Sequence, residues 1–264
     1  MKDSDLIFGL MASLGKDAYS FDDLAWLTAP FSVSISSLRT NLSRMSAAGV
    51  IAVDRAGRNA FYRFADKGRR ISRNVSKGFR TPDWSAWDGA YWGVIFSVPE
   101  AHGEARHSIR KKLTKYHFVC LNPGFWIRPV HPDERIPEIL AGILSSGYCR
   151  LIRFHNHMEF SAEQAAALWN LREVDRGFTS GLSLLDEGFE KLPRLTPSQA
   201  LVEKMTVGDA VVNFLFADPL VPPQFLPALW QGDSIRTQFK RFDELATLGS
   251  KPYWKHIFEK ESAV

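Results

Sequence analysis

Residues 32–64 contain the pattern that most constrains how this chain can fold. Apolar residues recur there every three or four positions and predict one buried helix face, made by Ile35, Leu38, Leu42 and Met45. Gly49 can end the helix in a left-handed conformation. Two short apolar strands follow, joined by a turn at Ala56-Gly57-Arg58-Asn59. The pattern therefore predicts a helix followed directly by a β-hairpin.

The opposite face of the predicted helix is polar and carries no carboxylate. Its side chains are hydroxyls, one amide and two guanidinium groups, from Ser36, Ser37, Arg39, Thr40, Asn41, Ser43 and Arg44. Base edges and phosphates offer mainly hydrogen-bond acceptors, and the DNA backbone is anionic, so such a face suits a helix that reads DNA. An ordinary surface helix and hairpin with scattered charge would show the same apolar spacing.

Local charge favours the DNA-binding interpretation. From Arg39 to Arg80 the sequence has eleven Arg and Lys residues and two Asp residues, a net charge of +9. The whole chain has a net charge of +4, so the residues outside this segment sum to −5. A basic patch on a slightly acidic body is typical of a nucleic-acid-binding module. The residues predicted to contact DNA are Ser34, Ser36, Ser37, Arg39, Thr40, Asn41, Arg44, Arg55, Arg58, Asn59 and Arg63.

Two more helices are predicted before this stretch. Residues 3–14 have the apolar period of a helix that Gly15 ends, and Ser20 can cap a helix over residues 21–31 that Pro30 stops. Three helices and a two-stranded wing predict a winged helix-turn-helix, with the third helix in the major groove. Residues 65–80 follow as a basic helix that either links domains or adds phosphate contacts. The first predicted domain is 1–80.

The rest of the chain predicts two further domains. Within residues 88–160, strands and amphipathic helices alternate in the order β-α-β-β-α-β, which fits a small ferredoxin-like domain. Residues 161–264 have helical patterns interrupted by prolines and predict an all-α domain, with one helix expected at 223–230. The expected class is thus a multidomain α+β protein.

Composition points to a soluble, cytoplasmic binding protein. Two cysteines, Cys120 and Cys149, make neither a disulfide framework nor a zinc set. No apolar run reaches the ~20 residues of a membrane span, and the short N-terminal apolar run follows acidic residues, unlike a signal peptide. Nucleophile elbows and glycine-rich phosphate loops are absent from the sequence, which gives no support for an enzyme or a cofactor.

Short motifs spread along the chain match the pattern of one family. They are Ala29-Pro30-Phe31, LRTNLSRM at 38–45, GRNAFYRF at 57–64, Gly68-Arg69-Arg70, WDGAYW at 87–92, Asp218-Pro219 and LPALWQG at 226–232. In their order and spacing the chain resembles the PaaX-type repressors of phenylacetate catabolism. The resemblance implies a winged-helix domain, a Cas2-like ferredoxin-like middle domain and a helical C-terminal domain. It also implies a homodimer on a palindromic double-stranded DNA operator, released by an aryl- or acyl-CoA such as phenylacetyl-CoA.

An effector of that kind needs apolar walls and a few cations for phosphates or a carboxylate. The residues predicted to bind it are Trp126, Arg128, Arg150, Arg153, Trp169 and Arg172. Packing of the tryptophans and ordinary ion pairs of the arginines would explain the same residues.

Two alternative functions stay open. A Cas2-like metal-dependent nuclease would need an acidic residue at the end of the first middle-domain strand, where only Glu100 follows Pro99. His155 and His157 share one face of a predicted strand and could bind a metal with Glu159, but ordinary strand histidines are the commoner case, and no metal site is predicted. The other alternative is an architectural DNA-binding protein without a ligand.

Overall fold

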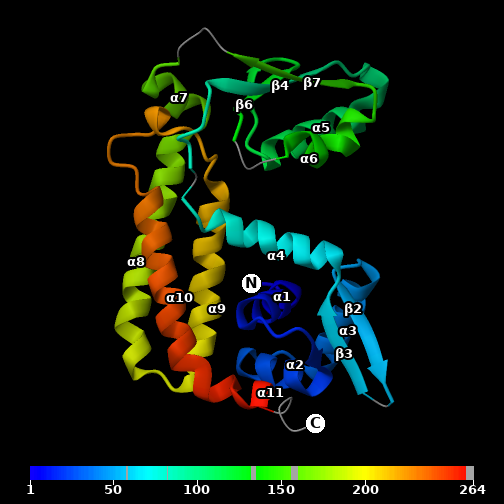
Figure 1. Cartoon of the computed structure of the whole chain (residues 1–264), viewed down its shortest axis with the longest axis vertical. Coiled ribbons are helices and arrows are strands. Elements are labelled where there is room, and N and C mark those ends of the chain that lie inside the picture. The colour runs from blue at the N-terminus through cyan, green and yellow to red at the C-terminus, as the bar shows by residue number, and fades with distance from the viewer. Residues whose placement is uncertain (58, 82, 132–134, 156–159, 260–264) are drawn as a thin grey trace. The chain divides into compact units, whose positions relative to one another are not determined.

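The chain forms two compact units, each built from segments that are distant in the sequence. The structure, a computed structural model, describes residues 1–57, 59–81, 83–131, 135–155 and 160–259. The first unit comprises residues 1–81, 178–216 and 232–264, and the second comprises 82–177 and 217–231. Figure 1 shows the chain with most of its helices and strands labelled.

The first unit begins with three helices and a small antiparallel sheet. Its N-terminal elements are α1 (Asp3–Leu14), β1 (Tyr19–Ser20), α2 (Phe21–Thr28), the short 3-10 helix η1 (Ala29–Phe31), α3 (Ile35–Ala47), β2 (Ile51–Ala56), β3 (Asn59–Phe64) and α4 (Asp66–Gly78). Local signals set these boundaries. Gly15 ends α1 at a φ of +69°, and Ser20 and Asp23 form a capping box at the start of α2. The sheet has the order β1-β3-β2.

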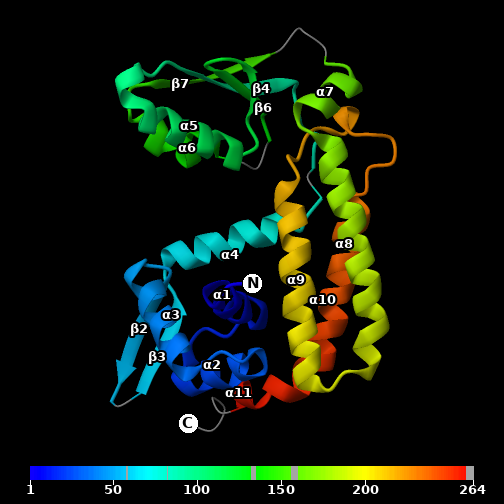
Figure 2. The same ribbon diagram turned by 180° about the vertical axis from the view of Figure 1, so that it is seen from behind.

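Long helices complete the first unit. They are α8 (Leu171–Lys191), of which the first unit takes the part from Phe178, followed by the 3-10 helix η3 (Leu192–Arg194), α9 (Pro197–Ala217), α10 (Gly232–Trp254) and α11 (His256–Glu259). Helices α8, α9 and α10 run side by side (Figures 1 and 2). The predicted helix at 223–230 is wrong, since only a 3-10 turn, η4 (Pro223–Phe225), forms there. Prolines 222, 223 and 227 lack the N–H donors that a longer helix needs.

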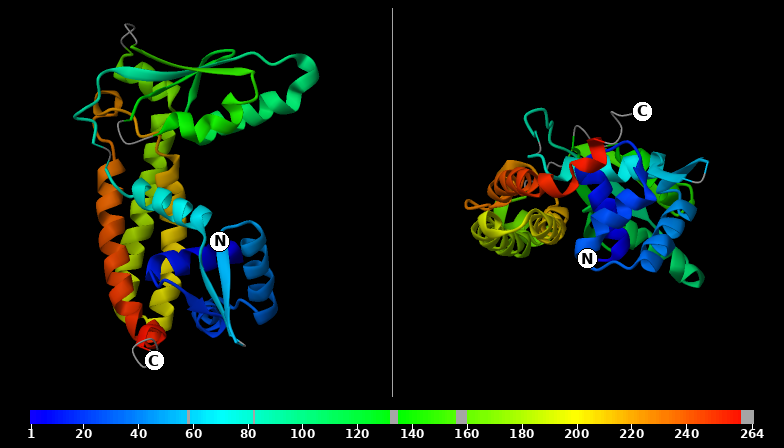
Figure 3. Two further views of the ribbon diagram at one scale, coloured as in Figure 1. Left: turned by 45° about the vertical axis from the view of Figure 1, so that its right-hand side comes forward. Right: turned by 90° about the horizontal axis from the view of Figure 1, so that it is seen from below.

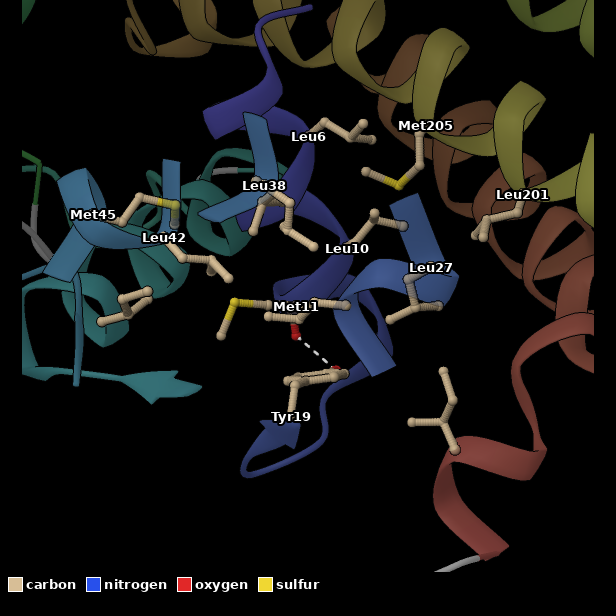
Figure 4. Packing of buried hydrophobic residues seen from close by; sticks show 14 residues of the cluster. Leu6, Leu10, Met11, Tyr19, Leu27, Leu38, Leu42, Met45, Leu201 and Met205 are labelled. Atoms are coloured by element: carbon tan, nitrogen blue, oxygen red, sulfur yellow. Dashed lines mark hydrogen bonds between the residues drawn. The ribbon is translucent and has the colours of Figure 1, made fainter. Parts of the chain in front are cut away.

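The N-terminal helices share their core with the C-terminal part of the chain. Leu6 and Leu10 of α1 and Leu38 of α3 are at most 3% exposed, and Leu201 and Met205 of α9 belong to the same buried cluster (Figure 4). Ile257 of α11 joins this cluster as well. The approach is close, because a Cβ placed on Gly9 would lie 2.6 Å from Cε of Met205.

Polar contacts fasten the same two regions together. The Trp26 indole N–H donates to the Tyr253 carbonyl (3.2 Å), the Tyr253 hydroxyl donates to the Trp26 carbonyl (2.8 Å), and the two rings stack. The Lys16 ammonium donates to the Ile257 carbonyl (2.9 Å) and pairs with the Asp23 carboxylate (3.3 Å). The end of α10 and α11 thus form part of the structure around α2.

The second unit contains a four-stranded antiparallel sheet. Its elements are β4 (Ala90–Phe96), the 3-10 helix η2 (Glu100–His102), α5 (Gly103–Lys115), β5 (Val119–Asn122), β6 (Phe125–Pro129), α6 (Ile136–Leu144), β7 (Cys149–His155) and α7 (Ala162–Leu168). The strand order is β5-β6-β4-β7. Helices α5 and α6 cover one face (Figure 3), where Val94 packs with Ile109 and Leu140. This is the sheet order of a ferredoxin-like domain.

Candidate nucleic-acid interface

The buried side of α3 fixes which residues it turns outward. Leu38, Leu42 and Met45 are 0%, 1% and 6% exposed and belong to the buried core, as predicted. Ile35 was predicted to be buried as well, and this is wrong: its side chain is 46% exposed. Phe31 and Val33, which precede the helix, pack against the core instead. The space that the first helical turn could fill is therefore already occupied.

Two of the predicted DNA contacts are bound within the protein. The Ser37 hydroxyl donates to the Asp3 carboxylate (2.5 Å), and the Asn41 amide donates to the Ser37 carbonyl (3.0 Å) and hydroxyl (3.2 Å). Both side chains are only partly exposed. The Ser37–Asp3 bond ties α3 to α1 and so fixes the rotation of the helix, and the Asn41 bonds orient the Ser37 side chain from within α3.

The outward face of α3 consists of other residues. Ser36, Arg39, Thr40, Ser43 and Arg44 are all exposed. The Arg39 guanidinium lies 5.0 Å from the centre of the Phe21 ring. Ser43 was absent from the predicted contacts, although its place three residues after Thr40 and seven after Ser36 puts it on the same helix face. Ser34, also predicted, caps the helix by accepting the Ser37 N–H.

The hairpin contributes fewer free cations than the sequence suggested. Arg55 and Asn59 are exposed, but the Arg63 guanidinium donates to the Asp54 carboxylate across the two strands (2.6 Å). This hydrogen bond and the charge of Asp54 raise the pKa of Arg63. Arg58 lies outside the described residues. Arg55 is thus the clearest anion-binding side chain of the described hairpin.

The cationic side chains of helix α4 fall into two groups, one bonded within the protein and one exposed. The Lys67 ammonium donates to the Ala48 carbonyl (2.8 Å), and Arg69 donates to the Phe64 carbonyl (2.6 Å) and the Asp66 carboxylate (2.5 Å). The bonds to Ala48 and Phe64 fasten α4 to the end of α3 and to β3. Arg70 and Arg73 are exposed on the side opposite the buried Gly68, where they extend the basic surface.

Five of the six residues predicted to bind an effector are divided between the two faces of the second-unit sheet. Residues directly opposite in neighbouring antiparallel strands share a face. Trp126 lies opposite Val94, whose face α5 and α6 cover, and Arg128 and Arg153 both lie opposite Trp92 on that same face. Arg150 lies opposite Ile95 on the other face.

Trp169 belongs to an aromatic cluster on that other face. Its ring packs against Phe225 and Phe160, and its indole N–H is buried with no hydrogen-bond partner among the described residues. Tyr91 of β4 lies in the same cluster. Arg172 is exposed at the start of α8. The structure therefore does not bring the six predicted residues together.

Three of the four predicted arginines of this set have partners within the protein. Arg128 is 2% exposed, donates to the Tyr116 carbonyl (2.8 Å) and lies over the Phe118 ring. Burial, with a smaller contribution from the Arg128 charge, lowers the pKa of His117 to about 4. Arg153 pairs with Asp88 (2.5 Å), and Arg150 donates to the Cys149 carbonyl (3.1 Å).

Metal-binding geometry is not seen in the described part of the chain. No three His, Cys, Asp or Glu residues gather there as a possible ligand set. His155 lies 3.6 Å from the Asp88 carboxylate, whereas His157 and Glu159 lie outside the described residues. Helices long and apolar enough to cross a bilayer are likewise absent from these residues.

Three family models match consecutive parts of the chain. They are the PaaX-like protein model at residues 6–68, the PaaX protein central Cas2-like domain at 85–167 and the PaaX-like protein C-terminal domain at 169–256. The chain belongs to the PaaX family. The match confirms the predicted resemblance and the Cas2-like character of the middle domain.

One relative and one solved structure are also similar to this chain. The transcriptional repressor PaaX of Escherichia coli (strain K12) is 26% identical over 214 residues, which cover 75% of this chain and 65% of the repressor. The match thus spans slightly less than two thirds of that relative. The uncharacterized protein Rv0674 from Mycobacterium tuberculosis shares the fold, with a TM-score of 0.61 and 23% identity over 92% of this chain and 96% of that one.

Proposed function

We propose that this protein is a DNA-binding transcriptional repressor of a catabolic operon. Its helices α1–α3 and strands β2–β3 would form a winged helix-turn-helix. The observation that carries the proposal is the outward face of α3, where hydroxyl side chains are flanked by Arg39 and Arg44 and no residue of the helix is a carboxylate. The similarity to the E. coli repressor supports it.

The contacts of α3 suggest a division of roles in DNA recognition. Ser36, Thr40 and Ser43 are exposed hydroxyls that can bond to base edges. Thr40 would accept a hydrogen bond, because its hydroxyl donates to the Ser36 carbonyl (2.9 Å). Arg39, Arg44 and Arg55 would bind phosphates, which fixes the register of the helix without reading sequence. Ser37 and Asn41 would position the helix through their hydrogen bonds to Asp3 and to each other.

The active form would be a homodimer on a palindromic operator in the cytoplasm. A dimer with two winged helices places two recognition helices in successive major grooves when the half-sites lie one turn apart, roughly 34–36 Å. Operator symmetry would then mirror the two-fold symmetry of the protein.

The effector would be an aryl- or acyl-CoA that releases the operator. Of the predicted binding residues, Trp169 is the strongest candidate, because its unpaired indole N–H lies in an apolar aromatic cluster. An effector can release DNA only if it binds the free conformation more tightly. A thermal-shift screen with phenylacetyl-CoA and other acyl-CoA thioesters tests this. A ligand at about 100 times Kd should add about 2.7 kcal/mol, and a flat panel would contradict it.

Salt dependence tests DNA binding and the placement of the interface. Each lost phosphate contact should reduce the slope of log K against log salt by about 0.9 on duplex DNA. We expect that reduction for Arg44→Ala on an operator duplex. Arg110→Ala, which removes an exposed cation of α5, should leave the slope unchanged. If the slope for Arg44→Ala were the same as that for Arg110→Ala, the interface would lie elsewhere. Binding without sequence preference would favour an architectural protein.

A further inference from the structure

Ile35 is an apolar exception in the polar start of α3. It occupies the first helical position, directly after the capping Ser34, and its side chain is 46% exposed. Its neighbours in sequence are hydroxyl residues, with Ser34 and Ser36 oxygens 3.0 Å apart. The core position at this end of the helix is filled by Phe31 and Val33, so the packing of α3 does not require an isoleucine there.

The rotation of α3 places Ile35 next to its outward face. Leu38 and Leu42 are held in the core, and Ser37 is bound to Asp3 on the other side. In a helix, residue 35 lies directly below residue 39 on one side of the outward residues. Ile35 therefore borders Ser36 and Arg39, both exposed. When a recognition helix enters the major groove, residues of its N-terminal turn contact base edges.

The major groove offers one apolar group to such a side chain. Thymine presents a C5-methyl group there, which the other three bases lack. Resting on the proposed DNA-binding function, we infer that Ile35 contacts a thymine methyl group and gives each half-site a preference for thymine at one position. The adjacent Ser36 hydroxyl can bond the polar edge of the same or the next base pair.

Replacing thymine by deoxyuridine tests this contact by removing only the methyl group. Duplexes are first selected from a random-sequence pool with the full-length protein, and each thymine of a selected duplex is then replaced singly. We expect one replacement per half-site to weaken wild-type binding about fourfold, the effect of losing one buried methyl. Fluorescence anisotropy at fixed salt measures the dissociation constants.

Variants assign the effect to Ile35. For Ile35→Ala, the same replacement should leave affinity unchanged, because the apolar partner is already gone. Ile71→Ala removes an isoleucine of similar exposure from α4 and should keep the wild-type fourfold sensitivity. Urea unfolding checks that both variants fold.

Two results would overturn the inference, and they are distinguishable. In the first, a sequence is selected, but either the Ile35→Ala protein keeps the sensitivity to deoxyuridine or the wild type shows none. The thymine contact is then wrong, while the proposed repressor function stands. If no sequence is enriched from the pool, sequence-specific DNA binding fails together with the contact.

Discussion

Gly68 offers a sharp test of how α4 is fastened to the hairpin. A Cβ at this position would lie 2.2 Å from the Val50 carbonyl oxygen and 2.8 Å from Cδ1 of Phe64. The Val50 carbonyl cannot turn away easily, since it also accepts the Ala65 N–H (3.0 Å). Gly68→Ala should therefore force α4 away from the start of β2.

A matched variant isolates the cost of this clash. Gly208 lies inside α9 of the same unit, and a Cβ there would meet only Cε2 of Phe239 at 3.9 Å, an ordinary contact. Both substitutions gain about 1 kcal/mol of helix propensity. Overpacking costs about 1–3 kcal/mol and applies only to Gly68. The unfolding free energy of Gly68→Ala should thus be lower than that of Gly208→Ala by about 1–3 kcal/mol.

Urea unfolding measures this difference through the midpoint at an unchanged slope. Hydrogen exchange adds a local readout, because the Ala65 amide should exchange faster in Gly68→Ala than in Gly208→Ala. If the two variants are equally stable and the Ala65 amide is equally protected, the close approach of α4 and β2 is wrong.

Two further predictions concern buried charge. The pKa of His117 is lowered to about 4, below the ordinary value of 6.5. Between pH 6.5 and pH 4, His117 of the unfolded chain is therefore protonated, whereas His117 of the folded chain stays neutral. The unfolding free energy should therefore fall by about 2 kcal/mol from pH 7 to pH 5. His117→Asn should remove that loss, and asparagine tolerates the φ of +58° at this position. Urea titrations at the two pH values measure the difference. Lys16→Met should cost about 3 kcal/mol, because it leaves the buried Asp23 carboxylate without its cation. Lys191→Met, at an exposed pair, should change stability by less than about 1 kcal/mol in the same assay.

Local signals in the sequence predicted most of the elements. Gly15 and Ser20 mark helix ends through interactions within a few residues, and the structure uses them as expected. Ile35 was assigned wrongly because apolar spacing shows which residues share a face, but not where along the helix the core ends. Phe31 and Val33, just before the helix, pack against the core at the position predicted for Ile35.

Long-range packing could not be predicted in the same way. The period of α9 indicates a buried face, yet nothing local shows that Leu201 and Met205 pack against α1. The effector residues show the same problem. Arg128 and Arg150 belong to neighbouring parts of one sheet, but the pairing register puts them on opposite faces, and register depends on strands far apart in the sequence.

The shared core of the first unit also bears on how the protein is made. The ribosome releases the N-terminal residues first. Leu201, Met205 and Ile257 belong to the same buried cluster as Leu6 and Leu38 but emerge much later. We expect the segment proposed to read DNA to stay incompletely packed until residues 201–257 have also been translated. A prematurely terminated polypeptide would then carry the α3 side chains without the packing that holds them, and it would be a poor competitor for the operator.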